Sequence, residues 1–250
     1  MKTVLRIFTP LVDSLLSVIF PCTCTLCKNV VEEAILGVVC RSCWGKIDSI
    51  PDPFCSVCGY PFSSRNVDPG TLCGSCRRKL FAFDVARSQS PFTDPLKEII
   101  HQFKYCGHLS LARPLARYLE GVYRRFPDHF RSDVIIPVPL HRARERERGF
   151  NQAAELAKHL SQRVDIPFKV GWLLRTRPTD VQAGLSRRQR RINMKGAFQV
   201  SPRARLAKQD VLLVDDVFTT GTTLNECAKI LKEHGCPRVN VLTVARVTRD

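Results

Sequence analysis

The sequence Val211-Leu212-Leu213-Val214-Asp215-Asp216-Val217-Phe218-Thr219-Thr220-Gly221-Thr222-Thr223 decides the fold of this chain. Its first four residues are apolar and predict a strand that is covered on both faces, with the two acids where the strand ends. Gly221 permits a tight turn at positive φ, and Thr222 or Thr223 can cap a helix predicted over residues 224–234. Gly235 is the expected C-cap of that helix. The stretch therefore predicts a strand, a short loop and a helix.

The loop between this strand and helix is suited to a sugar phosphate. Backbone N–H groups, hydroxyls and a helix N-terminus would hold the phosphate. The residues concerned are Thr219, Thr220, Gly221, Thr222 and Thr223. Asp215 and Asp216 would repel a phosphate, so we expect them to bind ribose hydroxyls or Mg²⁺. The alternative is an ordinary strand–turn–helix corner, and a P-loop for ATP is disfavoured because the loop has no lysine.

The complete run of apolar residues, two acids and a Thr/Gly-rich loop resembles the phosphoribosyl-pyrophosphate (PRPP) motif of type I phosphoribosyltransferases. This resemblance implies PRPP and Mg²⁺ as ligands. It implies that Asp215 and Asp216 are the catalytic acids and that residues 219–223 bind the 5-phosphate.

Length and charge limit the class of protein. The 250 residues suffice for one large or two modest domains, and a hydrophobic content of 44% is ordinary for a globular protein. The net charge of +16 indicates a polyanionic partner such as nucleic acid, a phosphorylated metabolite or acidic membrane. Residues 131–209 hold 18 Lys and Arg against 6 Asp and Glu, so much of the charge is concentrated there.

The first twenty residues are apolar with two early positive charges, which is also the pattern of a signal peptide. Arg6, Pro10 and Asp13 interrupt every candidate apolar core, and no small-residue cleavage site follows. Apolar residues at helical spacing favour a short amphipathic helix packed on the domain. No run of about 18 uninterrupted apolar residues occurs, so we expect no membrane span.

Eight of the twelve cysteines form four C-x-x-C pairs. The pairs are Cys24/Cys27, Cys40/Cys43, Cys55/Cys58 and Cys73/Cys76. Two pairs supply the four thiolates that structural Zn²⁺ prefers, and the gaps between pairs fit zinc ribbons, so we expect two structural zinc ions. The spacing leaves open whether the pairs combine sequentially or interleave, and whether Cys22 replaces Cys24. A module this small buries little core, and the metal would supply its stability.

Residues 81–250 alternate strands with helices and therefore predict a parallel α/β sheet. The expected strands cover residues 81–90, 133–138, 211–214 and 239–245. The expected helices begin at residue 95 and cover residues 109–123, 149–163 and 224–234. Ligands of such sheets bind at the carboxyl ends of the strands.

That rule selects two basic segments. The loop after strand 133–138 carries Arg142, Arg148, Asn151 and Gln152, whose side chains would hold pyrophosphate through forked guanidinium contacts; the alternative is a solvated turn with Arg/Glu pairing. Residues 174–193 are polar, long and contain glycine, which suits a lid over a phosphorylated substrate or a nucleic-acid patch. The predicted lid residues are Arg175, Gln182, Ser186, Arg187 and Arg190.

Further motifs give a resemblance to the ComF/GntX family of competence protein F-like proteins. They are the four zinc-ribbon pairs, Phe103-Lys104-Tyr105-x-Gly107, Pro137-Val138-Pro139-Leu140, Arg148-Gly149-Phe150-Asn151-Gln152, Gln182-x-x-Leu185-Ser186-x-x-x-Arg190-x-x-Asn193 and Gly196-Ala197-Phe198. The resemblance implies an N-terminal helix and double zinc ribbon over residues 1–80 and a type I phosphoribosyltransferase-like domain over residues 81–250. It also implies a cytoplasmic location and a role in DNA uptake and competence, with single-stranded DNA and proteins of the uptake machinery as partners.

Three functions stay open at this point: a phosphoribosyltransferase, a non-catalytic module that binds single-stranded DNA, and a regulator that senses PRPP without turnover. The acceptor of a transfer reaction cannot be read from the sequence. Phosphoribosyltransferases recognise the acceptor with a variable hood, and we expect the zinc module to occupy that place. The module would otherwise cap the domain or grip nucleic acid through its flanking basic residues.

Overall fold

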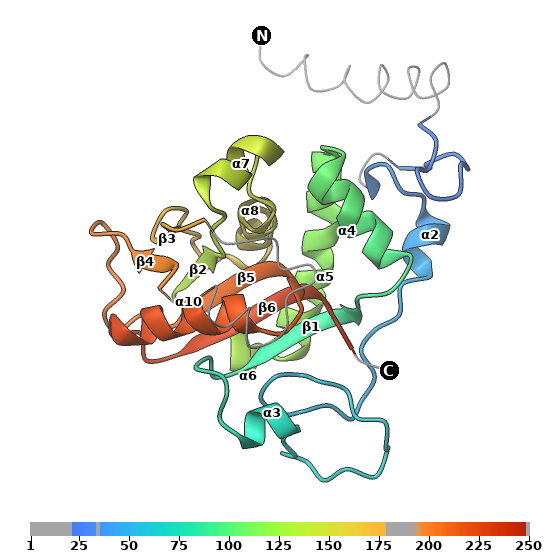
Figure 1. Ribbon diagram of the computed structural model, residues 1–250. Coiled ribbons are helices and arrows are strands. Elements are labelled where there is room, and N and C mark those ends of the chain that lie inside the picture. The colour runs from blue at the N-terminus through green and yellow to red at the C-terminus, as the bar shows by residue number, and fades with distance from the viewer. Residues whose placement is uncertain (1–21, 34–35, 179–193, 195, 249–250) are drawn as a thin grey trace.

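The computed structural model describes residues 22–33, 36–178, 194 and 196–248 (Figure 1). The amphipathic helix predicted within residues 1–20 lies outside these ranges. No helix within them is long and apolar enough to cross a membrane.

A four-stranded parallel sheet forms the centre of the molecule. In chain order its strands are β1 (Ala86–Pro91), β2 (Val134–Pro137), β5 (Val211–Phe218) and β6 (Val239–Arg246), and their spatial order is β1-β6-β5-β2. All three pairings are parallel, so the four carboxyl ends lie at one edge. A separate antiparallel pair consists of β3 (Leu173–Arg175) and β4 (Phe198–Val200). The predicted parallel α/β fold is confirmed.

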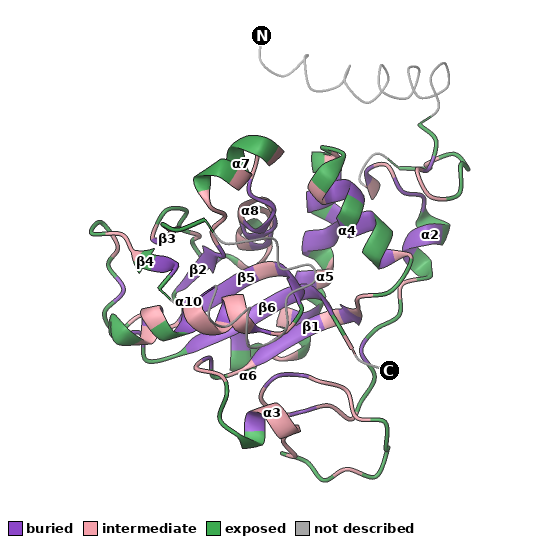
Figure 2. Cartoon of the chain, viewed as in Figure 1, coloured by how far each residue is buried: buried purple, intermediate pink, exposed green. Residues whose placement is uncertain are grey.

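Helices cover both faces of this sheet. One face carries α4 (Leu96–Tyr105), α5 (Ala112–Arg125) and α8 (Gln152–Val164), and the other carries α10 (Thr222–Glu233) (Figure 1). Leu212 and Val214 of β5 pack on the first face and Leu213 on the second, as the alternation of a strand requires. Figure 2 shows the strands as the buried layer, and Asp215 is the one residue of β5 that is not fully buried. The shorter helices are α2 (Arg41–Gly45), α3 (Gly74–Arg77), η2 (Leu109–Leu111), α6 (Pro127–Phe130) and α7 (Arg142–Arg148).

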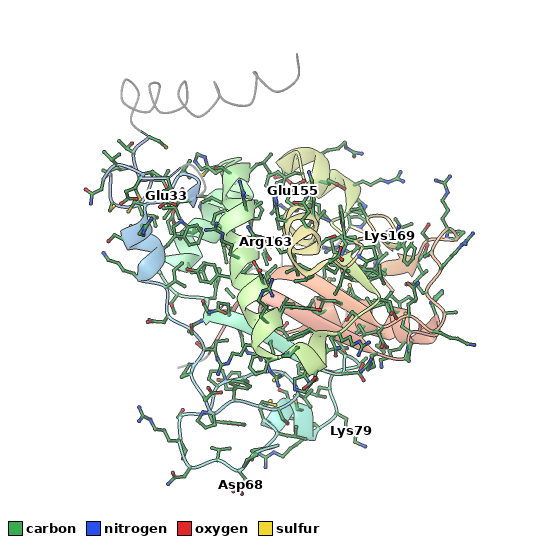
Figure 3. The ribbon with its side chains drawn as sticks, turned by 180° about the vertical axis from the view of Figure 1, so that it is seen from behind. Glu33, Asp68, Lys79, Glu155, Arg163 and Lys169 are labelled. Carbon is green, nitrogen blue, oxygen red and sulfur yellow. The ribbon has the colours of Figure 1, made fainter. Side chains whose placement is uncertain are left out.

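The two ribbons of the N-terminal region pack against different parts of this domain. The first ribbon contains α2 and lies on α5, where the ring centroids of Trp44 and Tyr118 are 5.6 Å apart. The second ribbon contains α3 and lies beside the edge strand β1, where the Ala86 N–H donates to the Val57 carbonyl at 2.7 Å. In Figure 3 Lys79 marks this ribbon at the opposite end of the molecule from the first. The predicted domain boundary at residue 80 stays a prediction.

A salt bridge links the neighbouring helices α5 and α8 on the sheet's first face. Arg163 Nη1 of α8 lies 2.9 Å from Glu120 Oε2 of α5 (Figure 3). Both side chains are only partly exposed, so this pair is screened less than a surface pair. The contact fixes the spacing of α5 and α8, the two helices that cover β5 and β6.

Several elements end at other positions than predicted. β5 continues through both acids to Phe218, because Asp215, Val217 and Phe218 all keep their pairing with β6. β1 begins at Ala86 instead of residue 81. The helix predicted from residue 149 is α8, which begins at Gln152, and the preceding charged loop contains α7.

The predicted caps of α10 are wrong. Thr222 and Thr223 lie inside the helix, and its N-cap is Gly221 in the left-handed conformation. At the other end His234 is the C-cap, and Gly235 follows it with a φ of 86°. Glycine therefore supplies the left-handed conformation next to each end of this helix.

Candidate functional site

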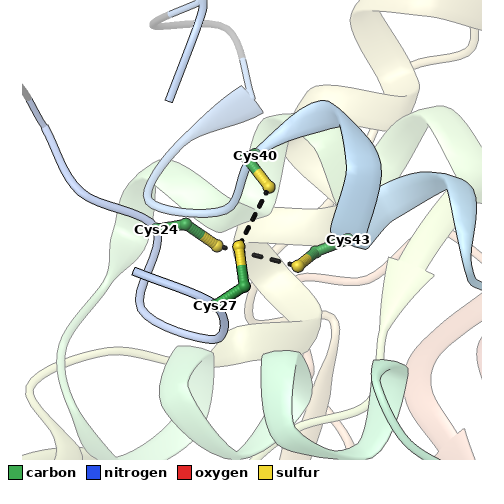
Figure 4. Close-up of side chains that lie close together, drawn as sticks. All are labelled: Cys24, Cys27, Cys40 and Cys43. Carbon is green, nitrogen blue, oxygen red and sulfur yellow. Dashed lines mark hydrogen bonds between the residues drawn. The ribbon is translucent and has the colours of Figure 1, made fainter. Parts of the chain in front are cut away.

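The eight paired cysteines come together as two sets of four. The first set is Cys24, Cys27, Cys40 and Cys43 (Figure 4), and the second is Cys55, Cys58, Cys73 and Cys76. Within each set the sulfur atoms lie within 4.8 Å of one another, so the pairs combine sequentially. Cys22 is exposed and lies outside the first set.

The sulfur geometry of these sets fits zinc. Four Zn–S bonds of ~2.3 Å in a tetrahedron place the sulfurs ~3.8 Å apart. The observed separations are 3.8 Å between Cys24 and Cys43 and 3.6 Å between Cys58 and Cys73. Two Cys₄ sites of this kind fit the double zinc ribbon expected from the sequence.

Positive charge surrounds the second set. Hydrogen bonds from the thiols of Cys58 and Cys76 hold the pKa of Cys55 far below its ordinary value. Arg246 of β6 is buried, and its Nη2 lies 3.6 Å from the Cys58 sulfur. Arg87 of β1 is also buried and donates to backbone carbonyls of this ribbon. Four thiolates with one Zn²⁺ carry two net negative charges, which these two guanidinium groups balance.

The two acids of β5 are adjacent but have different surroundings. Asp216 is buried, with Oδ2 lying 2.5 Å from Nζ of Lys104 on α4 and Oδ1 accepting from the Val217 N–H at 2.7 Å. Asp215 is half-buried, and burial together with the neighbouring Asp216 carboxylate raises its pKa to about 8. In the ligand-free protein at neutral pH, Asp215 therefore holds a proton that a bound cation can displace.

Residues 219–223 form the turn from β5 into α10. A Cβ at Gly221 would lie 2.6 Å from the Phe218 ring and 2.8 Å from the Phe81 ring, and φ there is 76°. Only glycine fits this position without displacing the aromatic side chains. The Thr220 hydroxyl accepts from the Thr222 N–H at 3.4 Å, and the turn leads directly to the N-terminus of a twelve-residue helix. A turn of this kind at a helix N-terminus is suited to an anion, and the predicted phosphate-binding role stays a prediction.

A cavity of about 390 Å³ lies at the carboxyl edge of the sheet, between β5, α4 and α7. The predicted residues that line it are Asp215, Asp216, Thr219, Thr223, Arg148, Gln152 and Arg175. Lys104, His141 and Arg144 line it as well. The structure thus brings together the predicted acids, both ends of the predicted phosphate loop and part of the predicted pyrophosphate segment. We call this the acid cavity.

Helix α7 gives the acid cavity a basic wall. His141 is its N-cap, with Nδ1 accepting from the Ala143 N–H at 3.3 Å. Arg144 and Arg148 are four residues apart and share one helix face. The Arg148 guanidinium lies 5.1 Å from the centroid of the Tyr105 ring. Carboxylates on one side and guanidinium groups on another suit a ligand with hydroxyls or a cation at one end and anionic groups at the other.

Other predicted site residues lie outside the cavity or outside the described chain. Arg142 is exposed on α7 and does not line the acid cavity. Asn151 is the buried N-cap of α8, accepting from the Ala153 N–H at 3.0 Å and donating to the Val138 carbonyl at 3.1 Å. The lid residues Gln182, Ser186, Arg187 and Arg190 lie outside the described residues. The roles predicted for all of them stay predictions.

The sequence analysis did not assign Lys104 and Arg144 to the site. Lys104 lies in the last turn of α4, and its Nζ reaches Asp216 at the end of the neighbouring strand β5. Arg144 is not predicted as a site residue, because the sequence does not predict α7. Arg144 lies four residues before Arg148, and this spacing places the two side chains on one face only if the segment is helical.

Replacing Asp215 by asparagine should stabilise the ligand-free protein at neutral pH. Folding raises the pKa of this acid from 3.8 to about 8. Ionisation therefore favours the unfolded state increasingly as the pH rises from about 4 to 8. We expect Asp215→Asn to raise the free energy of unfolding by about 1–2 kcal/mol at pH 7.5 and by much less at pH 4.5. Denaturant melts at the two pH values measure this, with the exposed acid variant Asp128→Asn as control. An equal effect of Asp215→Asn at both pH values would contradict the raised pKa.

Each cysteine set should hold its own metal ion. We expect Cys43→Ser to lower the zinc content from two ions to one per chain and to destabilise the protein by more than about 3 kcal/mol, because the first ribbon loses its metal. The matched control is Cys106→Ser, an exposed cysteine outside both sets. Elemental analysis and thermal melts read out the two effects. Two tightly bound zinc ions in Cys43→Ser would show that the ligand set is assigned wrongly.

Comparison with protein families gives two matches on this chain. The double zinc ribbon domain matches residues 15–77, and the phosphoribosyl transferase domain matches residues 147–250. The first range contains both cysteine sets. The second contains the strand–loop–helix unit with the two acids and most of the acid cavity's lining.

Whole-chain relatives extend these matches. Competence protein F of Haemophilus influenzae is 34% identical over 230 residues, covering 89% of this chain and 96% of that protein. DNA utilization protein YhgH of Escherichia coli O157:H7 is 31% identical and covers 90% of this chain and 97% of that protein. Competence protein ComFC of Bacillus subtilis is 29% identical and covers 79% of each chain. The chain therefore belongs to the competence protein F family, with a double zinc ribbon joined to a phosphoribosyltransferase-type domain.

Proposed function

We propose that this protein binds PRPP together with Mg²⁺ in the acid cavity and acts in the cytoplasmic handling of DNA during uptake. The choice of PRPP as the ligand rests on one observation. Two acids, a glycine-dependent turn at a helix N-terminus and an arginine-bearing helix meet in one cavity at the carboxyl edge of a parallel sheet. Each corresponds to one chemical part of PRPP, namely the ribose, the 5-phosphate and the pyrophosphate.

The 5-phosphate is assigned to residues 219–223. Backbone N–H groups of this turn and the N-terminus of α10 offer hydrogen bonds and partial positive charge to an anion. Thr219 and Thr223, which both carry hydroxyls, line the cavity. No lysine is needed for a single phosphate held in this way.

The ribose hydroxyls are assigned to Asp215 and Asp216. A carboxylate accepts two hydrogen bonds from adjacent hydroxyls, and Lys104 forms an ion pair with Asp216 beside its neighbour. Pyrophosphate is assigned to the α7 wall, where Arg148 and Arg144 line the cavity. When the bond between the anomeric carbon and pyrophosphate breaks, guanidinium groups stabilise the departing anion, and the carboxylates stabilise positive charge at the sugar.

Magnesium fits the donor groups of this cavity. Mg²⁺ is commonly held by one or two carboxylates plus phosphate oxygens of the substrate. Asp215 Oδ1 accepts from the Asp216 N–H at 2.9 Å, and burial together with the neighbouring Asp216 carboxylate raises the pKa of Asp215, so a cation bound there would be favoured. When bound, Mg²⁺ would neutralise charge on the pyrophosphate. The two Cys₄ sites would hold structural zinc, which supplies folding energy to the ribbons.

The DNA role rests on relatives and on charge. Two relatives bear names that refer to competence and one bears a name that refers to DNA utilization. The net charge of +16, with 18 Lys and Arg in residues 131–209, is of the kind that attracts a phosphate backbone. Single-stranded DNA and proteins of the uptake machinery are the proposed partners, and this binding would weaken steeply as salt rises.

Titration of PRPP and Mg²⁺ into the zinc-loaded protein tests the ligand. We expect Asp215→Ala with Asp216→Ala to weaken binding about a hundredfold, because two charge-assisted interactions with the ribose are lost. The matched control is Asp128→Ala with Glu233→Ala, two exposed acids that do not line the acid cavity.

Pyrophosphate release against a panel of nucleobases then separates the activities. Binding with release assigns a transferase, and binding without release assigns a PRPP-binding regulator. Undetectable PRPP binding by the wild-type protein, with salt-sensitive binding of single-stranded DNA, would contradict the proposal of PRPP and leave the DNA-binding module.

A further inference from the structure

A second cavity of about 470 Å³ shares one lining residue, Thr219, with the acid cavity. One wall is the second zinc ribbon, including Tyr60 and Arg78, together with Phe81. The opposite wall is the carboxyl end of β5 and β6, with Phe218, Thr220 and Arg246. Thr219 lines both cavities. The volume is within the ~300–1,000 Å³ range of small-molecule sites. We call this the ribbon cavity.

We propose that the ribbon cavity is the acceptor pocket of the PRPP site, and that it takes a planar heterocyclic ring with a hydrogen-bond acceptor on its edge. This inference rests on the proposed function, because it assigns the partner of PRPP. Both cavities open at the same sheet edge and share the first residue of the phosphate loop. A ligand that extends past Thr219 from the sugar therefore enters the space under the second ribbon.

The walls of the ribbon cavity favour a flat aromatic ring. Tyr60 and Phe81 are half-buried and contribute aromatic surface to the cavity. Phe81 is held in place, because its ring lies 4.7 Å from that of Phe83 at an angle of 20° and also packs against Phe218. Stacking on an aromatic side chain accommodates any planar base.

The segment that carries Phe81 is fixed to the phosphate loop. Gly221 has no room for a Cβ because the Phe81 ring occupies that space. The Ala82 N–H donates to Asn225 Oδ1 of α10 at 2.7 Å. The wall of one cavity and the turn that lines the other are therefore one packed unit.

Arg246 fixes the ribbon side of the cavity. Its guanidinium lies 4.1 Å from the centroid of the Phe218 ring and 5.3 Å from that of Tyr60. It also donates to the Cys58 carbonyl of the second cysteine set. A buried cation that contacts the ribbon, the aromatic wall and the end of β6 prepares the pocket before ligand arrives, which reduces the entropic cost of binding.

The polar rim indicates which edge the ring presents. Arg78 is exposed at the rim, and a guanidinium group only donates hydrogen bonds. A ring with a carbonyl oxygen satisfies it, whereas an amino group in the same place does not. In a transfer reaction, the ring nitrogen's lone pair forms the bond to the anomeric carbon. The carbon–oxygen bond to pyrophosphate breaks with its electron pair on pyrophosphate, and the ring nitrogen's proton passes to water.

Nucleoside monophosphates test the pocket, because they join a ring to a ribose phosphate. Calorimetric titrations of the zinc-loaded full chain compare GMP, UMP and AMP with ribose 5-phosphate. We expect GMP and UMP to bind about tenfold tighter than ribose 5-phosphate. Tyr60→Leu should bring this ratio close to one, whereas Tyr60→Phe, which keeps the ring, should preserve it. Arg78→Ala should remove the preference of GMP over AMP. Zinc content of two ions per chain verifies that each variant is folded.

Ribose 5-phosphate separates this inference from the proposal on which it rests. If ribose 5-phosphate and PRPP bind, but no nucleotide binds tighter or the ratio is unchanged in Tyr60→Leu, the acceptor pocket is refuted and the PRPP site stands. If neither sugar phosphate nor nucleotide binds, both proposals fall. If only an oligonucleotide such as dT10 binds and Tyr60→Leu weakens it, the ribbon cavity takes a DNA strand and the acceptor assignment is wrong.

Discussion

The burial of two neighbouring carboxylates in the central strand is the constraint on which the candidate site depends. β5 is otherwise apolar and packed on both faces, and burial of an unpaired carboxylate costs several kcal/mol. Lys104 offsets this for Asp216, and Asp215 instead has a pKa raised to about 8. A ligand that brings a cation or hydroxyl groups to these acids would therefore stabilise the folded protein. This supports the proposal of a ligand site at the carboxyl edge of the sheet, where the apolar core around the acids supplies the stability that offsets the cost of burying them.

The two ribbons have different relations to that edge. The first packs its cysteine set and Trp44 onto α5, within the hydrophobic cluster that covers one face of the sheet. The second lies beside β1 and is held by two buried cations, Arg87 of the edge strand β1 and Arg246 of its neighbour β6. Because Arg246 also packs on Phe218 at the end of β5, the charge of the second metal site is balanced by a residue that reaches the ligand edge. Among the described residues of the two ribbons, only those of the second line the proposed acceptor cavity, and the hood role expected for the zinc module stays a prediction.

The sequence predicts the parts of the fold that depend only on residues close together in the chain. Four apolar residues before two acids, and C-x-x-C spacing, identify the buried strand and the metal sets without knowledge of the rest of the chain. It could not predict that β5 runs on to Phe218, because that depends on pairing with β6. It missed Lys104 and Arg144 for the same reason, since one reaches the acids from another helix and the other needs the unpredicted α7 to share a face with Arg148. The sequential pairing of cysteines also required the three-dimensional placement of the ribbons.

The pKa of Asp215, measured with and without PRPP and Mg²⁺, tests most directly whether the buried acids of β5 form the ligand site. Carbon-13 NMR of the aspartate carboxyl carbons, with Asp215→Asn used to assign the resonance, gives the pKa in the free protein and in the presence of PRPP with Mg²⁺. The account predicts titration near 8 in the free protein. It predicts a fall of at least about one unit when the ligands are added, because they supply the missing positive charge and hydroxyl donors. Titration near 4 in the free protein, or a value that PRPP and Mg²⁺ leave unchanged, would contradict it.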